Sequence, residues 1–562
     1  MLERSPEVLR FEVVEGKCSD VIKGYKSGRG DGRNPQSSVN SMKRIFYIFL
    51  FLFAFLFYWN TALRIENRTE AEDAYAYAAM VETEGHSWLY HPHHLLHGSL
   101  MKAGYSGLQS LGWNGRAFDF LMLISSLSAA GTLLLFFQFC YRRFSLRPVS
   151  SLLATGLLAV SYGFWRYAAE AEVVLPASFL GLAALYCATG LDHHSRRMVG
   201  LGVLLSVLAV LMHIMNAVVV FVAIPCFYLL RRRWGATAAH LLLGCGGVAA
   251  VFCWFYSAGL MNESVGGSFL PVGFGSFVKA MIALGQCVVS GNFLLGFVSI
   301  RAFLSELFAS RMLMEEFYLG ARLARSVVLF STLTFLILGS LVIGALWRAG
   351  WVWKNLIHER ARIHLPEGLP AIAVVAIWFF GYAGLLLCVE PGNPELWVMG
   401  LTPFWLLICG LVLLPLTVDN RLWLPFAALL FLLVHNGVSG IGVLGDPGKD
   451  YQHQKAKWIL EHATSNDVVV TAGNPVFERY LRYHFEGAVI YLHKKLPDLD
   501  GLAAPAGRVF VLGDVFNQVE SLRIRFPKQT DDIAVYAEKL KPEVELIDDD
   551  EFGGVFLLNN EY

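Results

Sequence analysis

Long apolar runs alternate with short polar segments through most of the chain. The run at 199–230 is interrupted by His213 and Asn216, and its length predicts a hairpin of two short spans turning near MHIMN. Runs of about 18 or more apolar residues are typical of transmembrane helices. The pattern predicts an α-helical polytopic membrane protein with about eleven spans. The apolar runs lie at about 45–59, 118–140, 149–164, 173–190, 199–230, 236–258, 326–347, 369–389, 397–416 and 422–442.

Basic residues mark one side of these spans. Arginine clusters lie at 142–143, 196–197 and 231–233, and Lys43 and Arg44 precede the first run. Because cytoplasmic loops carry an excess of Lys and Arg, we expect the N-terminus in the cytoplasm. The loop at 62–117 and the region after the last span then lie on the other side, which we expect to be the periplasmic face of a bacterial inner membrane.

Both ends of the chain depart from this pattern. Residues 1–41 are polar and rich in Gly, Ser and Lys, which predicts a disordered cytoplasmic tail, and Met42-Lys43-Arg44 looks like a natural translation start. After the predicted transmembrane domain at 42–445, segments of helical spacing alternate with short β-type runs at 467–473, 488–494, 508–514 and 554–560. The region 446–562 therefore predicts a small extracytoplasmic α/β domain with a largely parallel sheet.

Composition narrows the function classes. The chain is 55% hydrophobic and 16% charged, with a mean hydropathy of +0.50, which is too apolar for a soluble protein. Its formal net charge of zero gives no basic field for nucleic acid. The sequence has no C-x-x-C spacing for zinc, and 446–562 has no G-x-G-x-x-G or P-loop for a nucleotide.

The predicted catalytic loop at 62–117 begins with acidic residues. Glu72 and Asp73 lie just beyond the first span, where an ionised group is costly unless water or a partner reaches it. A carboxylate in this place could take a proton from an acceptor hydroxyl. Asp73 is the first candidate and Glu72 the second. The alternative is a helix-start cluster with Glu70, because acids favour the positive end of the helix dipole.

Four histidines follow in the same loop. His91 could cap a helix that has Pro92 at its first position. His93 and His97 are four apart and could form a metal pair, although no H-E-x-x-H pattern completes it. As alternatives, His91, His93, His94 and His97 could contact a phosphate or sugar, or pack at the membrane interface. We assign no metal ligands and no cofactor, and leave a divalent metal open.

Arg166, Glu172 and Glu395, at the ends of later spans, are further candidates for substrate binding. Arg166 and Glu170 are four apart and could form a surface ion pair, whereas Glu172 precedes an unbroken apolar run and could project into a cavity. Glu395, in the EPGNPELW loop, could line the same face or belong only to a turn. Arginines of the long segment 259–325 could hold a lipid phosphate, and the sequence does not choose among them.

These positions together resemble the GT-C superfamily of polyprenyl-phosphate-sugar-dependent transferases, and most of all its protein O-mannosyltransferase and lipid A aminoarabinose transferase group. The resemblance covers about 42–442. It rests on Asp73 in EDAYAY, on His91-Pro92, and on FWRYAAEAEV, LAVLMHIMN and NPELWVMGLTPFWLL. It implies that Asp73 is the catalytic base. The chain departs from the family at His93 and His94, where His-Pro-Pro or His-Pro-Gly is usual.

The leading hypothesis is an inverting glycosyl transfer on the non-cytoplasmic face. The donor would be a sugar linked to a polyprenyl phosphate, and the acceptor a glycolipid, glycan or protein. Histidines 91–97 and an arginine would stabilise the leaving phosphate, and Glu172 would orient a substrate. One alternative is an O-antigen ligase or polymerase with an essential arginine in 301–325. Another is a transporter, which would place polar sites within broken helices and often show internal repeats.

Overall fold

The structure is a computed structural model of the whole chain. It describes residues 35–65, 72–83, 87–190, 196–261, 272–308, 323–358, 369–446, 451–473, 475–498, 502, 507–518, 523, 527–550 and 553–559. The predicted tail therefore lies mostly outside the described residues. The helix α2 already begins at Pro35, within the last part of that stretch.

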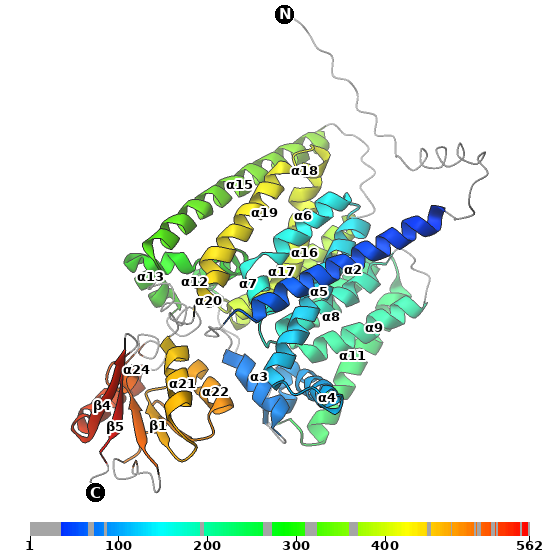
Figure 1. Cartoon of the computed structure of the whole chain (residues 1–562). Coiled ribbons are helices and arrows are strands. Elements are labelled where there is room, and N and C mark those ends of the chain that lie inside the picture. The colour runs from blue at the N-terminus through cyan, green and yellow to red at the C-terminus, as the bar shows by residue number, and fades with distance from the viewer. Residues whose placement is uncertain are drawn as a thin grey trace, which may run out of the picture. The chain divides into compact units, whose positions relative to one another are not determined.

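Seven helical stretches of the described chain are long and apolar enough to cross a membrane. They are α2 (Pro35–Ala62), α5 (Ala117–Arg143), α11 (Trp234–Ser257), α15 (Arg325–His358), α16 (Leu369–Val389), and two stretches that continue through a π-helical turn. The first of these joins α17 (Pro394–Ile408), η6 (Cys409–Leu413) and α18 (Leu414–Val418). The second joins α19 (Trp423–Asn436), η7 (Gly437–Ile441) and α20 (Gly442–Leu444). Figure 1 shows α15 and α19 side by side.

The predicted count of about eleven spans is not confirmed. An eighth span is reached if α6 (Pro148–Ala159) and α7 (Tyr162–Ala168), which bend by 71° at their junction, count as one. The other apolar helices are shorter: α8 (Val174–Ala188), α9 (Arg196–Met212), the stretch 214–230 and α12 (Phe274–Val288). A helix of 15 residues is about 22 Å long, which is less than the roughly 30 Å of a bilayer core.

The predicted turn at MHIMN is confirmed. His213 separates α9 from a returning stretch made of η3 (Ile214–Asn216), η4 (Val219–Ala223) and α10 (Ile224–Leu230). Leu211 packs near Phe255 at the end of α11, whereas Tyr228 meets His240 near its beginning. The two arms therefore run in opposite directions along α11.

Tertiary hydrogen bonds hold the bend between α6 and α7. The side-chain amide of Asn436 donates to the carbonyl of Val160 (2.7 Å) and to that of Val288 (2.9 Å). The indole Nε1 of Trp405 donates to the hydroxyl of Ser161 (2.8 Å). A break in a helix frees backbone groups that need partners in a membrane; Asn436 supplies one for the Val160 carbonyl, and Trp405 holds the Ser161 side chain.

The C-terminal region forms a small α/β unit. Its sheet contains β1 (Val468–Thr471), β2 (Ala488–Tyr491), β3 (Val509–Leu512), β4 (Val544–Asp550) and β5 (Gly553–Leu558), in the order β2-β1-β3-β5-β4. The first three strands are parallel as predicted, but β5 and β4 are antiparallel, so the sheet is mixed. The unit's helical elements are α21 (Tyr451–His462), α22 (Pro475–His484), η10 (Gly513–Val515), α24 (Pro527–Leu540) and η11 (Lys541–Glu543). The apolar helices and this sheet confirm the predicted fold class.

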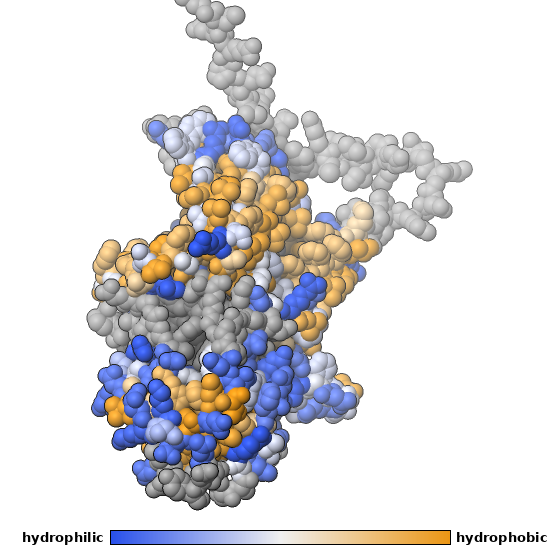
Figure 2. Space-filling model, turned by 60° about the vertical axis from the view of Figure 1, so that its left-hand side comes forward, coloured by the Kyte–Doolittle hydropathy of each residue, from blue (hydrophilic) through white to orange (hydrophobic). Residues whose placement is uncertain are grey.

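The helical part exposes apolar side chains in stripes. On α15 the exposed apolar residues, several of them in adjacent pairs, recur from Leu329 to Trp351 and form a broad face, as expected for a helix that meets lipid. Figure 2 shows a broad apolar surface over the helices on the face that it presents. The exposed apolar residues of α15 include Leu329, Leu333, Leu336, Ile343 and Trp347. Such a surface in water would favour aggregation, whereas in a bilayer it faces the apolar lipid chains.

The remaining elements connect these parts. The loop after α2 folds into α3 (Glu72–Glu82), η1 (Ser87–Tyr90), η2 (Pro92–His94) and α4 (His97–Ser110). The segment after α11 contains α12, η5 (Asn292–Gly296) and α13 (Val298–Phe308). Within this segment α12 packs against α7 and α17.

Candidate active site

Asp73 lies in the first turn of α3 and forms an ion pair with Arg479 of α22. Both side chains are partly exposed, 30% for Asp73 and 24% for Arg479. The adjoining face of α3 is buried through Ala74, Tyr77 and Ala78, a spacing of three and four that fixes the helix against its neighbours. Asp73 is thus held at the edge of the fold, where a substrate can reach it. The side chain of Glu72 lies outside the described part of the structure.

Glu172 is 2% exposed and lies between α7 and α8. The hydroxyl of Ser125 on α5 donates to the Glu172 carbonyl (3.0 Å) and accepts from its backbone N–H (3.4 Å), which fixes the segment. Burial, the Glu395 carboxyl and the Asp73 carboxyl, in that order, raise the pKa of Glu172 well above its usual value. Its Oε2 has no hydrogen-bond partner among the described residues. A raised pKa favours the protonated form of Glu172, and its projection into a cavity stays a prediction.

Glu395 stands in the first turn of α17 and interacts electrostatically with both Glu172 and Tyr77. Asn393 caps this helix, accepting from the Leu396 N–H (3.4 Å), and the Tyr382 hydroxyl donates to the Leu396 carbonyl (2.5 Å). The EPGNPELW loop thus both makes the predicted turn and delivers an acid to the cluster. We call Asp73, Glu172, Glu395 and Arg479 the acid cluster.

Tyr77 joins the acid cluster to the histidines of the loop. Its hydroxyl is hydrogen-bonded to His94 Nε2 (3.2 Å), and its ring meets the rings of His94 and His97 edge-on. The His94 ring also lies 5.0 Å from those of His91 and His213, centre to centre. Tyr77 therefore contacts His94 and His97 and also interacts with the acids of the cluster.

The histidines differ in role from one another. His91 caps η2 as predicted, accepting from the His93 N–H (3.3 Å), with Pro92 at the first position. His93 is exposed on η2 whereas His97 is buried at the start of α4, so the predicted helical pair of the two does not form. Burial lowers the pKa of His97 to about 3 and lowers that of His94. Both are therefore neutral, and neither supplies positive charge to a phosphate.

Arg166 is 1% exposed and forms an ion pair with Glu170. The predicted pair is thus present, but it is buried inside the helical bundle and not on the surface. Taking two charges out of water is costly unless each is paired. The charge of Arg166 is therefore balanced by Glu170, whereas Glu172, two residues further along the chain, belongs to the acid cluster.

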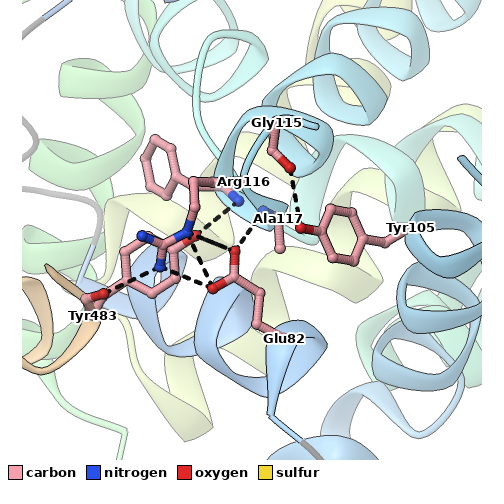
Figure 3. Close-up of polar contacts among 7 residues, drawn as sticks. Glu82, Tyr105, Gly115, Arg116, Ala117 and Tyr483 are labelled. Carbon is pink, nitrogen blue, oxygen red and sulfur yellow. Dashed lines mark hydrogen bonds and ion pairs between the residues drawn. The ribbon is translucent and has the colours of Figure 1, made fainter. Parts of the chain in front are cut away.

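A second contact joins α22 to the loop after α3 (Figure 3). Arg116 pairs with Glu82 (2.8 Å) and lies over the Tyr483 ring, 4.2 Å from its centre. Glu82 also accepts from the Ala117 N–H (2.7 Å) and from the Tyr483 hydroxyl (2.8 Å). The Tyr105 hydroxyl donates to the neighbouring Gly115 carbonyl (3.0 Å). We call Glu82, Arg116 and Tyr483 the latch.

Sequence reasoning missed Arg479, Tyr483 and the latch. The segment PVFERYLRYH was expected to be a helix, and it is α22, but nothing in its spacing says which surface it covers. The feature that could have marked this segment as part of a site is the presence of two arginines and two tyrosines on one short amphipathic helix. A search of the described residues finds no group of three or more His, Cys, Asp or Glu side chains arranged to hold a metal ion.

An apolar cavity of about 280 Å³ lies between α15, α17 and α19. Its lining includes Val288, at the end of α12. The neighbouring Cys287 donates its thiol to the carbonyl of Pro394 (3.1 Å), which adjoins Glu395. The cavity wall is thus linked through α12 to the start of α17, where the acid cluster begins. Other lining residues include Leu157, Phe335, Leu338, Trp405 and Leu424.

The fold defines a polytopic helical membrane protein with a small α/β unit, and its comparisons with known proteins are structural. No protein-family model matches the sequence, and no curated protein matches it. ArnT from Cupriavidus metallidurans, in a crystal structure bound to undecaprenyl phosphate, is 12% identical over 92% of this chain and 98% of that chain, with a TM-score of 0.44. The oligosaccharyltransferase AglB from Archaeoglobus fulgidus, in complex with an inhibitory peptide and a dolichol-phosphate, is 11% identical over 92% and 75%, with a TM-score of 0.42.

The resemblance to the GT-C superfamily rests on the sequence segments given above. At these TM-scores the likenesses assign no activity to this chain.

Proposed function

We propose that this protein is an inverting glycosyltransferase that moves a sugar from a polyprenyl-phosphate donor to a glycolipid, glycan or protein acceptor on the non-cytoplasmic face. The observation that carries the proposal is the acid cluster. Three acids from three separate segments, Asp73, Glu172 and Glu395, lie within electrostatic range of one another and of Tyr77 in a chain built of membrane-type helices. Ionisable groups gathered beside a membrane domain usually mark a functional site.

The proposed chemistry needs one base and a leaving phosphate. The Asp73 carboxylate takes the proton of the acceptor hydroxyl while the acceptor oxygen attacks the anomeric carbon of the sugar. The bond between that carbon and the phosphate oxygen breaks, and polyprenyl phosphate leaves with the electron pair. Attack from the face opposite the leaving group inverts the anomeric configuration. A positioned base of this kind contributes about 10²- to 10⁴-fold in rate.

Glu172 and Tyr77 take supporting roles in this scheme. A protonated Glu172 donates a hydrogen bond without adding a charge next to Asp73, which suits contact with a sugar hydroxyl. Neutral His94 and His97 shape the pocket through Tyr77. The apolar cavity between α15, α17 and α19 offers matching surroundings for part of an isoprenoid chain.

A complementation experiment tests the proposal. A deletion strain of the source organism is complemented with the wild type, Asp73→Asn or Asp119→Asn, and its glycolipids and glycoproteins are compared by mass spectrometry. Asp119, a partly buried acid in the first turn of α5, is the matched control. We expect the sugar-bearing product to be restored by the wild type and Asp119→Asn but not by Asp73→Asn at equal membrane abundance.

Restoration by Asp73→Asn would refute the role of Asp73. Loss of the product with Arg301→Gln and not with Asp73→Asn would favour the ligase or polymerase alternative.

A further inference from the structure

Arg479 reaches the acid cluster from a distant part of the sequence. It lies on α22 and pairs with Asp73 on α3, 406 residues earlier in the chain. The rest of this helix face is anchored as well. The ring of Tyr75 meets those of Tyr480 (5.0 Å) and Tyr483 (6.0 Å), and Tyr483 takes part in the latch. The position of Arg479 over Asp73 is therefore supported by several independent contacts.

The charge balance of the site singles out this guanidinium. Arg479 is the cation that acts on both Tyr77 and Glu172, alongside the carboxyl groups of Asp73 and Glu395. Arg166 is buried in its pair with Glu170, and the neighbouring His94 and His97 are neutral. A phosphate that enters beside three acids needs a positive partner, because like charges at close range repel strongly.

The exposure of Arg479 allows it to change partner. Its side chain is 24% exposed, whereas that of Arg166 is 1% exposed. A guanidinium carries five N–H donors in a planar fork and binds carboxylate and phosphate groups with similar geometry. It can therefore pass from one oxyanion to the other with a small side-chain movement.

We infer that Arg479 of α22 binds the phosphate group of the lipid donor, and that this exchange releases the Asp73 carboxylate to act as base. The inference rests on the proposed function and assigns to the C-terminal α/β unit a part of the donor site. In the absence of donor, Asp73 and Arg479 neutralise each other. Donor binding breaks this pair, so that the base becomes available only when the leaving group is in place.

The exchange makes Asp73 a competitor of the donor phosphate. Removing the Asp73 charge should therefore tighten phosphate binding even though it abolishes transfer. A merely structural ion pair gives the opposite result, because its loss would disorder the site and weaken every ligand.

Binding is measured with the full chain in lipid nanodiscs, using undecaprenyl phosphate as the probe and the uncharged alcohol undecaprenol as the control ligand. Arg479→Gln should weaken undecaprenyl phosphate binding by roughly tenfold or more, as expected for the loss of a charge-assisted contact, and leave undecaprenol binding unchanged. Arg482→Gln is the matched control, since Arg482 lies on the same helix but pairs with Glu478. It should bind both lipids as the wild type does.

Asp73→Asn should bind undecaprenyl phosphate several-fold more tightly than the wild type, and Asp73→Asn combined with Arg479→Gln should lose this gain. Unchanged phosphate binding in Arg479→Gln, or weaker phosphate binding in Asp73→Asn, would overturn the inference. If Arg479→Gln fails to fold, undecaprenyl phosphate binding by Asp73→Asn alone still tests the inference. If the wild type transfers sugar but either variant gives the adverse result, only the inference about Arg479 is overturned. If the wild type neither binds undecaprenyl phosphate nor transfers sugar, the proposed function itself is refuted.

Discussion

At the scale of single residues, burial separates the acids of the site into different protonation states. Glu172 is enclosed and faces the carboxyl groups of Glu395 and Asp73, whereas Asp73 itself is partly exposed and paired with Arg479. Pairs of acids whose surroundings push their pKa values apart are a common basis for dividing roles in an active site. In the proposed mechanism, this division gives Asp73 the role of base and Glu172 that of a hydrogen-bond donor.

The raised pKa of Glu172 predicts a specific pH dependence of stability. Between the ordinary glutamate value of about 4.5 and the higher folded-state value, the folded chain holds a proton that the unfolded chain has released. Stability of the wild type should therefore fall as pH rises from 4.5 towards neutrality. Glu172→Gln, which mimics the protonated acid, should remove this fall.

Thermal unfolding of the two proteins in detergent between pH 5 and 8 measures the difference. A melting temperature of Glu172→Gln that rises relative to the wild type with pH supports the assignment. If the melting temperatures of the two proteins change in parallel between pH 5 and 8, Glu172 is ionised in the folded protein over this range.

At the scale of helices and strands, the apolar pattern predicted where elements lie but not how they are bent or paired. Each predicted apolar run contains a described helix. The 71° bend between α6 and α7 was not predictable, because Asn436 and Trp405, far along the sequence, hold it. The strand β4 was missed because its sequence, VELIDDD, ends in three aspartates, which are rare in strands.

The site residues that could not be recognised from the sequence are those whose role depends on long-range contacts. Asp73, Glu172 and Glu395 were recognisable as acids at span ends, and the structure brings them together. Arg479 was not recognisable, since a surface arginine on a short helix is ordinary and its partner lies in another part of the chain. The neutrality of His94 and His97 depends on burial, which the loop sequence did not reveal.

The latch predicts a second pH dependence, of the opposite sign. Burial alone would raise the pKa of Glu82, but hydrogen bonds from Arg116, the Ala117 N–H and Tyr483 lower it overall. The stabilisation is therefore present above the unfolded value of about 4.5 and is lost as pH falls towards the lower folded value. Glu82→Gln should lower the free energy of unfolding by about 1–2 kcal/mol at neutral pH and have less effect in acid.

Hydrogen exchange of the α22 amides at pH 7 localises this effect. Faster exchange in Glu82→Gln, with no change in the exposed surface control Glu461→Gln, is the expected result. Equal exchange rates in all three proteins would mean that the latch does not hold α22.

At the scale of the whole molecule, the proposed function depends on which side of the membrane the loop of α3 and α4 occupies. The positions of the basic loops predict that this region lies opposite the cytoplasm. His93 is exposed in this loop, and Arg232 is exposed in the arginine cluster after α10. The two positions should therefore lie on opposite sides of the bilayer.

Cysteine labelling in intact cells tests this orientation. His93→Cys should react with a membrane-impermeant maleimide added outside the inner membrane, above the signal of the parent chain. Arg232→Cys should react only after permeabilisation. The reverse pattern would place the acid cluster in the cytoplasm and exclude a donor site on the other face.

The most direct test of the central claim is the release of polyprenyl phosphate from a labelled polyprenyl-phosphate sugar by the purified chain in nanodiscs, with acceptor-containing membrane extract added. The wild type and Asp119→Asn should release one polyprenyl phosphate for each sugar transferred. Asp73→Asn should lose at least about 10²-fold in rate. Release by Asp73→Asn at the rate of the wild type would contradict the account.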